Sequence, residues 1–147
     1  MTQHPRLRLV LIATFLVIAA PLSCGGSAKA AMAPAQVTMQ LQGDWLLTSY
    51  RPNVPLEAPL QGLLQIQLGQ LRVHVEGERI IATGPFVQVA RTYRVEEAFD
   101  QTATLVVSEP TGVSVRVWIE RQGNVLTFRP LDAPWNGEGT LLRVTGT

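Results

Sequence analysis

The stretch Val113-Ser114-Val115-Arg116-Val117-Trp118-Ile119-Glu120 alternates an aliphatic side chain with one of another type at every step. A period of two is that of a β-strand with one apolar face, because successive side chains of a strand point to opposite faces. Similar patterns recur before and after this stretch. They predict nine strands, over residues 45–50, 63–68, 71–76, 79–83, 86–96, 102–107, 113–120, 125–129 and 141–144.

Turn residues separate these predicted strands at short intervals. Gly69-Gln70 is a two-residue signal of a type II′ hairpin. Only residues 35–41 and 97–101 could host a helical turn. Short strands joined by tight turns form an antiparallel meander, and closing the meander into a barrel removes its exposed edges. The predicted fold is therefore all-β, an antiparallel meander closed into a small barrel of eight or nine strands.

The predicted strands belong to one domain over residues 39–147. About 110 residues are enough for a single hydrophobic core and too few for two. Before the domain, residues 24–38 are rich in Gly, Ala, Ser and Pro and lack periodicity, which indicates a flexible tether. The net charge of the chain is +1, and its arginines alternate with acids. A nucleic-acid-binding surface needs a clustered basic face, so we expect no nucleic-acid partner.

The first 23 residues have the organisation of a secretory signal peptide. Arg6 and Arg8 precede the apolar run 9–22, and small residues follow it. This basic, apolar and small order is typical of an export signal. The single cysteine, Cys24, comes directly after this segment, and one cysteine leaves an exported protein without a disulfide framework.

The segment Ser23-Cys24-Gly25 resembles the lipobox of bacterial lipoproteins, in which the cysteine is acylated and becomes the mature N-terminus. The resemblance implies that Cys24 carries a lipid and that this lipid holds the protein to a membrane. With Gly25 rather than Asp after the cysteine, it also implies the outer membrane of a bacterial envelope, facing the periplasm or the cell surface. Pro21 stands where the lipobox normally has Leu, and two alternatives stay open. Cleavage after Ala30 gives a secreted soluble protein, and an uncleaved signal gives a membrane anchor, although a span needs roughly 20 apolar residues.

The two ends of the domain resemble the lipocalin-like, or calycin, barrels. The segment Gly43-Asp44-Trp45 is similar to the Gly-x-Trp opening of their first strand, and Leu141-Leu142-Arg143-Val144 is similar to their last strand. The resemblance implies that Trp45 plugs the closed end of the barrel and that Arg143 packs across its ring. A planar guanidinium stacks on an indole and still bonds nearby carbonyls. Gly43, Trp45 and Arg143 are thus expected to be structural residues. Small META-type envelope domains, which open in a similar way, are the second family considered.

The domain offers little for catalysis or metal binding. Cys24 is assigned to the lipid and His4 belongs to the signal peptide, so His74 is the only histidine left. Neither a Ser-His-Asp triad nor a His/Cys metal cluster can be assembled from these residues. We expect no enzyme activity, no catalytic residue, no metal and no cofactor.

One polar residue interrupts an apolar strand face. Along residues 86–96 this face contains Val87, Val89, Arg91, Tyr93 and Val95. A guanidinium inside a barrel must be paired or reach water. In one interpretation Arg91 binds the carboxylate or phosphate of a ligand, with Tyr93 beside it. In the other, a bulge or the barrel rim turns Arg91 outward.

Trp135 is the third ligand-binding candidate. It lies in the loop before the last strand, where it is either a residue of the barrel mouth, an interface anchor, or a cap over the end of the core. The domain is therefore expected to act in binding, either as an envelope protein that contacts another periplasmic protein or as a hollow carrier of a small anionic or apolar ligand. The interior volume distinguishes these functions. Because the inward positions are mostly Leu, Ile, Val and Phe, we expect a filled interior.

Overall fold

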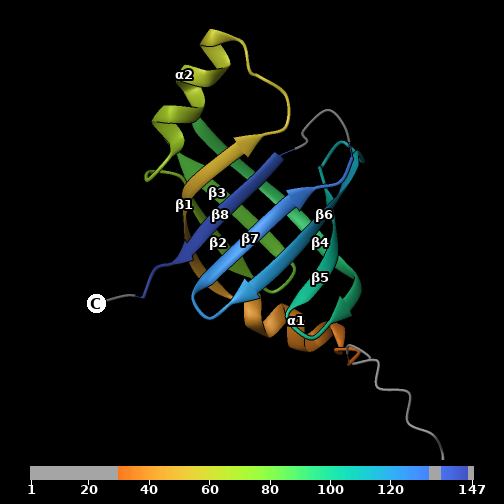
Figure 1. The fold of residues 1–147 in the computed structure, drawn as a ribbon. Helices are drawn as coiled ribbons and strands as arrows, with labels where there is room; N and C mark the ends of the chain where they lie inside the picture. The colour runs from red at the N-terminus through yellow and green to blue at the C-terminus, as the bar shows by residue number, and fades with distance from the viewer. Residues whose placement is uncertain (1–29, 133–136, 146–147) are drawn as a thin grey trace, which may run out of the picture.

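The computed structural model describes residues 30–132 and 137–145. Eight antiparallel strands form a closed barrel in which each strand pairs with its neighbours in the chain and the last strand returns to the first (Figure 1). The all-β prediction and the closed meander are thereby confirmed. The strands are β1 (Gly43–Pro52), β2 (Arg72–Glu76), β3 (Arg79–Gly84), β4 (Val87–Phe99), β5 (Thr102–Ser108), β6 (Ser114–Gln122), β7 (Val125–Pro130) and β8 (Gly137–Arg143).

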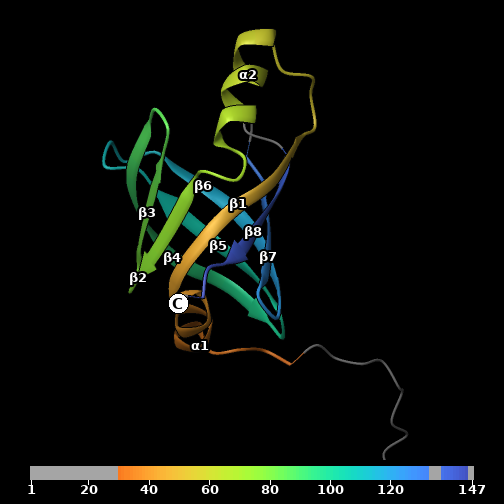
Figure 2. The same cartoon turned by 90° about the vertical axis from the view of Figure 1, so that its left-hand side faces the viewer.

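Two helices accompany the barrel, one at each end (Figures 1 and 2). Helix α1 (Pro34–Leu41) lies at the end where β1 begins, and it buries Val37 and Leu41 against the core. Helix α2 (Ala58–Gln67) connects β1 to β2 and projects from the opposite end. The two ends of the barrel are therefore built differently.

The packed part of the chain begins ahead of α1. Ala31 forms an isolated β-bridge with Phe99, and Met32 donates its backbone N–H to the carbonyl of Ala98 at 3.0 Å. The expected tether, residues 24–38, overlaps α1 at residues 34–38, and its first part lies outside the described residues. The segment that follows Ala30 thus contains all eight strands of the barrel together with α1.

The strands are strongly staggered. Thr92 of β4 pairs with Arg79 at the beginning of β3 and with Ser108 at the end of β5. Register shifts after Leu47 and after Val95 bend two of the strands further. Such a stagger closes eight strands into a barrel whose interior is just wide enough for side chains or one small ligand.

The strand predicted over residues 63–68 is wrong, because the chain is helical there up to Gln67, the last residue of α2. Short apolar runs do not distinguish a strand from a helix by periodicity alone. Pro59 lies in the first turn of α2, where the missing N–H is not needed. Gly69, with φ of +76°, follows the helix end and does not form the predicted hairpin. The barrel consequently has eight strands and not nine.

Residues 97–101, which could host a helical turn, do not form one, because β4 continues to Phe99. The register shift between Val95 and Glu97 moves the alternation by one residue, so that Ala98 is buried. A pattern with a strict period of two fails at such a bulge.

Candidate functional site

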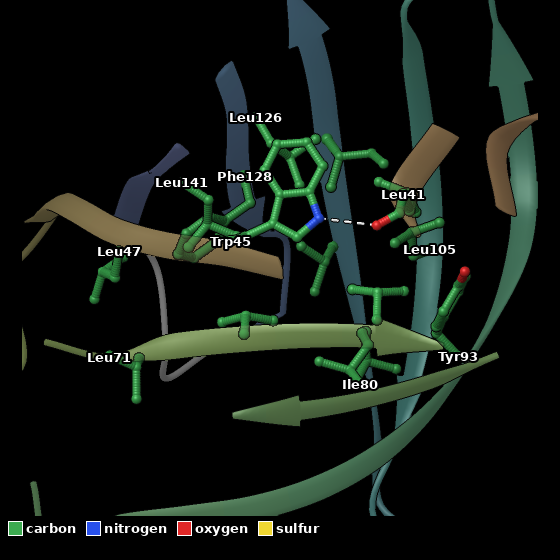
Figure 3. Close-up of a pocket in the computed structure, with 15 residues that line it drawn as sticks. Leu41, Trp45, Leu47, Leu71, Ile80, Tyr93, Leu105, Leu126, Phe128 and Leu141 are labelled. Carbon is green, nitrogen blue, oxygen red and sulfur yellow. Dashed lines mark hydrogen bonds between the residues drawn. The ribbon is translucent and has the colours of Figure 1, made fainter. Parts of the chain in front are cut away.

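A cavity of about 230 Å³ lies inside the barrel (Figure 3). The expectation of a filled interior is therefore wrong. Side chains from α1, from all eight strands and from the residue before β2 line this cavity: Leu41, Trp45, Leu47, Leu71, Val73, Val75, Ile80, Tyr93, Leu105, Val107, Val117, Ile119, Leu126, Phe128 and Leu141.

The width of the barrel explains why apolar residues do not fill it. Strand number and stagger set the distance across the interior, and they do so independently of side-chain size. On several sides of the cavity the wall is made by valines, at Val73, Val107 and Val117. These short branched side chains stay close to their own strands, and the space between them is left open.

Trp45 closes the end of the cavity next to α1. Its side chain is fully buried, with 0% exposure, and its Nε1 donates a hydrogen bond to the carbonyl of Leu41 at 2.8 Å (Figure 3). The guanidinium of Arg143 lies over the indole, with 4.9 Å from its carbon to the ring centre. Gly43 has φ of +110°, which favours glycine. The structure thus places all three expected structural residues at this closed end.

The opposite end of the cavity opens toward α2. Apart from the half-buried Ile80, the lining residues near α1 are buried, whereas toward the other end Leu71, Val73, Val107, Val117 and Phe128 are only half-buried. These half-buried residues lie toward the ends of their strands that face away from α1. The cavity is therefore a cup with its closed end at Trp45 and its mouth beside α2.

The lining contains no charged side chain. Its side-chain hydrogen-bonding groups, the indole of Trp45 and the hydroxyl of Tyr93, are already bonded to the protein. Tyr93 is buried, and its hydroxyl donates to the carbonyl of Gly77 at 2.9 Å. Burial raises the pKa of this phenol above its ordinary value of 10.0. A ligand in the cup meets an apolar wall with no free polar group to bind.

The position of Phe128 depends on a glycine that the sequence pattern did not single out. Gly139 of β8 lies opposite Phe128 in the β7–β8 ladder, and a methyl group at Gly139 would collide with the Phe128 ring. Tyr50 stacks on the same ring, with 6.1 Å between ring centres. The glycine thus makes room for an aromatic wall near the mouth.

The structure separates Arg91 from Tyr93. Arg91 continues the inward face of β4 and pairs with Ile80 of β3, but it does not line the cavity. Its Nη2 instead forms an ion pair with Glu109 at 3.0 Å, and its Nη1 donates to the carbonyl of Ala90. Arg91 lines a different hollow, between β4 and the loop after β5. Of the two candidates, only Tyr93 belongs to the cup.

The predictions made for Cys24 and Trp135 concern residues outside the described ranges. They stay predictions, as do the signal peptide and its alternatives. Trp118, on the outer face of β6, stacks against Arg129, whose guanidinium carbon lies 4.6 Å from the ring centre.

Within residues 30–132 and 137–145, no three His, Cys, Asp or Glu side chains are grouped so that they could hold a metal ion. His74 instead lies beside Asp44, at 2.9 Å between Nδ1 and Oδ1, where both side chains are about half-exposed. None of the helices in the described part of the chain combines the length and hydropathy of a transmembrane segment.

Comparisons of the chain with protein-family models, with curated proteins and with solved structures give no match. The eight-stranded closed meander is compatible with the lipocalin-like architecture that the sequence suggested. Among the residues that form the cup, Leu41, Ile80 and Phe128 were not predicted as site residues. In the sequence each of them is an apolar residue on an inward face. Residues of the packed core have the same appearance, so the sequence does not distinguish the two groups.

Proposed function

We propose that this domain binds a small, uncharged, apolar molecule in the cup. The observation that carries the proposal is the wall itself: fifteen residues without a charge, whose two side-chain hydrogen-bond donors are already used. Apolar ligands bind by removal of apolar surface from water. Of the anionic and apolar ligands considered from the sequence, the apolar class fits this wall, because Arg91 is held outside it by Glu109.

The energetic cost of an empty cup supports the same function. Closed apolar cavities left by core substitutions destabilise a protein by about 24 cal/mol per Å³, and on that scale 230 Å³ sets an upper limit of about 5.5 kcal/mol for a cup with an open mouth. This is a large part of the roughly 5–15 kcal/mol that stabilises a typical domain. A ligand that fills the cup restores these contacts, and its binding therefore adds to the free energy of unfolding.

The volume limits the ligand. Sites for drug-sized molecules have about 300–1,000 Å³, which is more than the 230 Å³ found here. We expect a single ring system or a short hydrocarbon chain inside the barrel, with any longer part extending through the mouth.

The cellular setting is part of the proposal. The basic and apolar order of residues 1–23 and the lipobox-like segment at Cys24 support export and lipid anchoring in the bacterial envelope. The pairing of Trp45 with Arg143 and the closed meander support membership of the lipocalin-like group. We propose a binding role rather than an enzymatic one, because the cup presents no nucleophile, acid or base to a ligand.

The test uses the neutral fluorescent probe N-phenyl-1-naphthylamine and the domain 31–147, which contains the closed sheet and α1 but lacks the apolar run 9–22. We expect saturable binding with one site per domain. Val117→Phe, which fills the cup from its wall, should weaken binding at least tenfold. Val125→Phe, at an exposed position away from the cup, is the matched control and should bind like the parent.

Equal affinity of the probe for the parent and for Val117→Phe, with both proteins folded by circular dichroism, would contradict the proposal. Binding that does not saturate would contradict it as well, because it indicates partition onto the surface.

A further inference from the structure

Helix α2 is an unusual element because it is hardly packed. Gln67, its last residue, is its only buried residue. Leu60, Leu63 and Ile66 are 49%, 47% and 41% exposed, and the helix projects beyond the barrel in both views (Figures 1 and 2). A helix of ten residues is marginal by itself in water and normally depends on packing of its apolar face. Here most of that face is left uncovered.

The turn between β3 and β4 adds an aromatic ring to the same end. Phe86 is 85% exposed and has φ of +65°, a conformation that is strained for a bulky residue. The side-chain Nε2 of Gln67 donates to the carbonyl of Pro85, so α2 and this turn are connected. Leu63 and Leu60 precede Gln67 by four and seven residues and therefore lie on the same side of the helix. The apolar side of α2 thus stands above the turn that carries Phe86.

We propose that this surface, made by Leu60, Leu63, Ile66 and Phe86 and called here the mouth patch, docks the barrel on a lipid bilayer. The mouth of the cup would then face the membrane. The docking itself needs no ligand in the cup. The proposal rests on the proposed function only in that the apolar ligand would pass through the mouth between the membrane and the cup.

Charge is the first reason for choosing a bilayer over a protein partner. The fourteen residues 58–71 contain no charged side chain. A protein interface usually combines its apolar centre with Trp, Tyr or Arg anchors and a hydrogen-bonding rim. The mouth patch offers only aliphatic side chains and one phenylalanine, which suit an acyl-chain environment without specific polar contacts.

The flanks of the segment supply the second reason. Arg51 and Arg72 lie in the strands that lead into and out of it, and both are exposed. Neither forms an ion pair with another described residue. Glu57 is the only acid between them. Exposed cations beside an apolar segment are complementary to lipid phosphates, whereas they would repel each other across a symmetric contact between two copies.

The cup supplies the third reason. Leu71 lines the cup and lies directly after α2, and it is also among the nearest neighbours of Gly84 before the Phe86 turn. The apolar lining therefore continues to the base of the mouth patch. A hydrocarbon chain could move from a bilayer into the cup along this route without crossing a charged side chain, and the amide of Gln67 is the polar side chain beside it.

The test measures flotation of the domain 31–147 with vesicles of phosphatidylcholine and with vesicles that also contain phosphatidylglycerol. We expect the parent to float with both. The pair Leu60→Gln and Leu63→Gln, combined in one variant, should reduce the bound fraction at least fivefold. The pair Val125→Gln and Leu142→Gln, at exposed apolar positions away from α2, is the control and should bind like the parent. Arg51→Gln with Arg72→Gln should reduce binding to the anionic vesicles more than to the neutral ones.

Failure of the parent to float would overturn the proposal. Equal flotation of the variant with Leu60→Gln and Leu63→Gln and of the control with Val125→Gln and Leu142→Gln would overturn it as well. Concentration-dependent dimerisation that disappears with Leu60→Gln and Leu63→Gln, without flotation, would overturn it in favour of a second copy. Probe binding to the cup is measured on the same variants. If the probe binds but the domain does not float, the docking is contradicted and the proposed binding function is retained. If the domain floats but does not bind the probe, the proposed binding function is contradicted and the docking is retained.

Discussion

Arg143 lies over the ring of Trp45, with 4.9 Å between the guanidinium carbon and the ring centre, although the two residues are ninety-eight positions apart in the chain. They are also direct partners in the β1–β8 ladder that closes the barrel. The Nη2 atom of Arg143 donates to the carbonyls of Gln40 and Gln42 at 3.1 and 2.5 Å. One side chain thereby joins the last strand, the first strand and the end of α1.

The plug should contribute strongly to stability. Trp45→Ala is expected to lower the free energy of unfolding by about 3–5 kcal/mol, the range for large aromatic residues removed from a core. The measurement is denaturant unfolding followed by far-UV circular dichroism. The chain offers a matched control in Trp118, which stacks on Arg129 at the surface. Trp118→Ala should cost about 1 kcal/mol or less, and equal losses for the two variants would contradict a plugging role for Trp45.

Because of Tyr93, the free energy of unfolding should decrease as the pH rises into the alkaline range. Burial, with a further contribution from the charge of Glu78, raises the pKa of its phenol, while hydrogen bonds with Thr38 and Gln42 act in the opposite direction. A group whose pKa is raised on folding contributes stability that is present below its unfolded pKa, about 10 here. That contribution is lost as the pH rises through the folded pKa.

Tyr93→Phe is therefore expected to be less stable than the parent at neutral pH, by about 0.5–1.5 kcal/mol for the lost hydrogen bond to Gly77. Above about pH 10 this difference should shrink, because the parent must ionise a buried phenol or unfold. Urea unfolding of both proteins across the alkaline range measures it. A difference that stays constant with pH would show that ionisation of Tyr93 is not linked to folding.

The anchor can be tested without the structure. In a Gram-negative host, Cys24→Ala should abolish labelling of the full chain by an alkyne fatty acid and release it from membranes, since no other cysteine can carry the lipid. Ser27→Ala is the control and should be labelled like the parent. Equal labelling of the Cys24→Ala and Ser27→Ala proteins would contradict a lipid on Cys24. A mature protein whose first residue is Ala31 would support simple secretion instead.

Much of the fold could be predicted because one face of almost every strand is buried, and burial imposes a period of two on the sequence. Val113 to Glu120 illustrates this, since the predicted strand and β6 differ only at their ends. The period of two failed to predict the structure where the side chains are not buried and where a bulge shifts the alternation of buried and exposed residues. Helix α2 packs against little, so its leucines follow no burial pattern, and the bulge after Val95 shifts the phase within β4.

The cup itself could not be predicted from the residues. A valine that faces a cavity and a valine that packs in a core look alike in sequence, and the difference comes from the stagger of the whole barrel. Arg91 shows the same limit. Its inward register was visible in the alternation, but the ion pair that holds it away from the cup depends on Glu109, which another strand and its loop bring near.

The most direct test of the central claim is the position of a bound apolar molecule. Intermolecular NOEs between N-phenyl-1-naphthylamine and the methyl groups of the labelled domain 31–147 measure it. We predict NOEs to Leu105, Val117 and Leu141, which line the cup, and none to Val125 or Leu142. NOEs confined to exposed methyl groups, with none to the lining residues, would contradict the account.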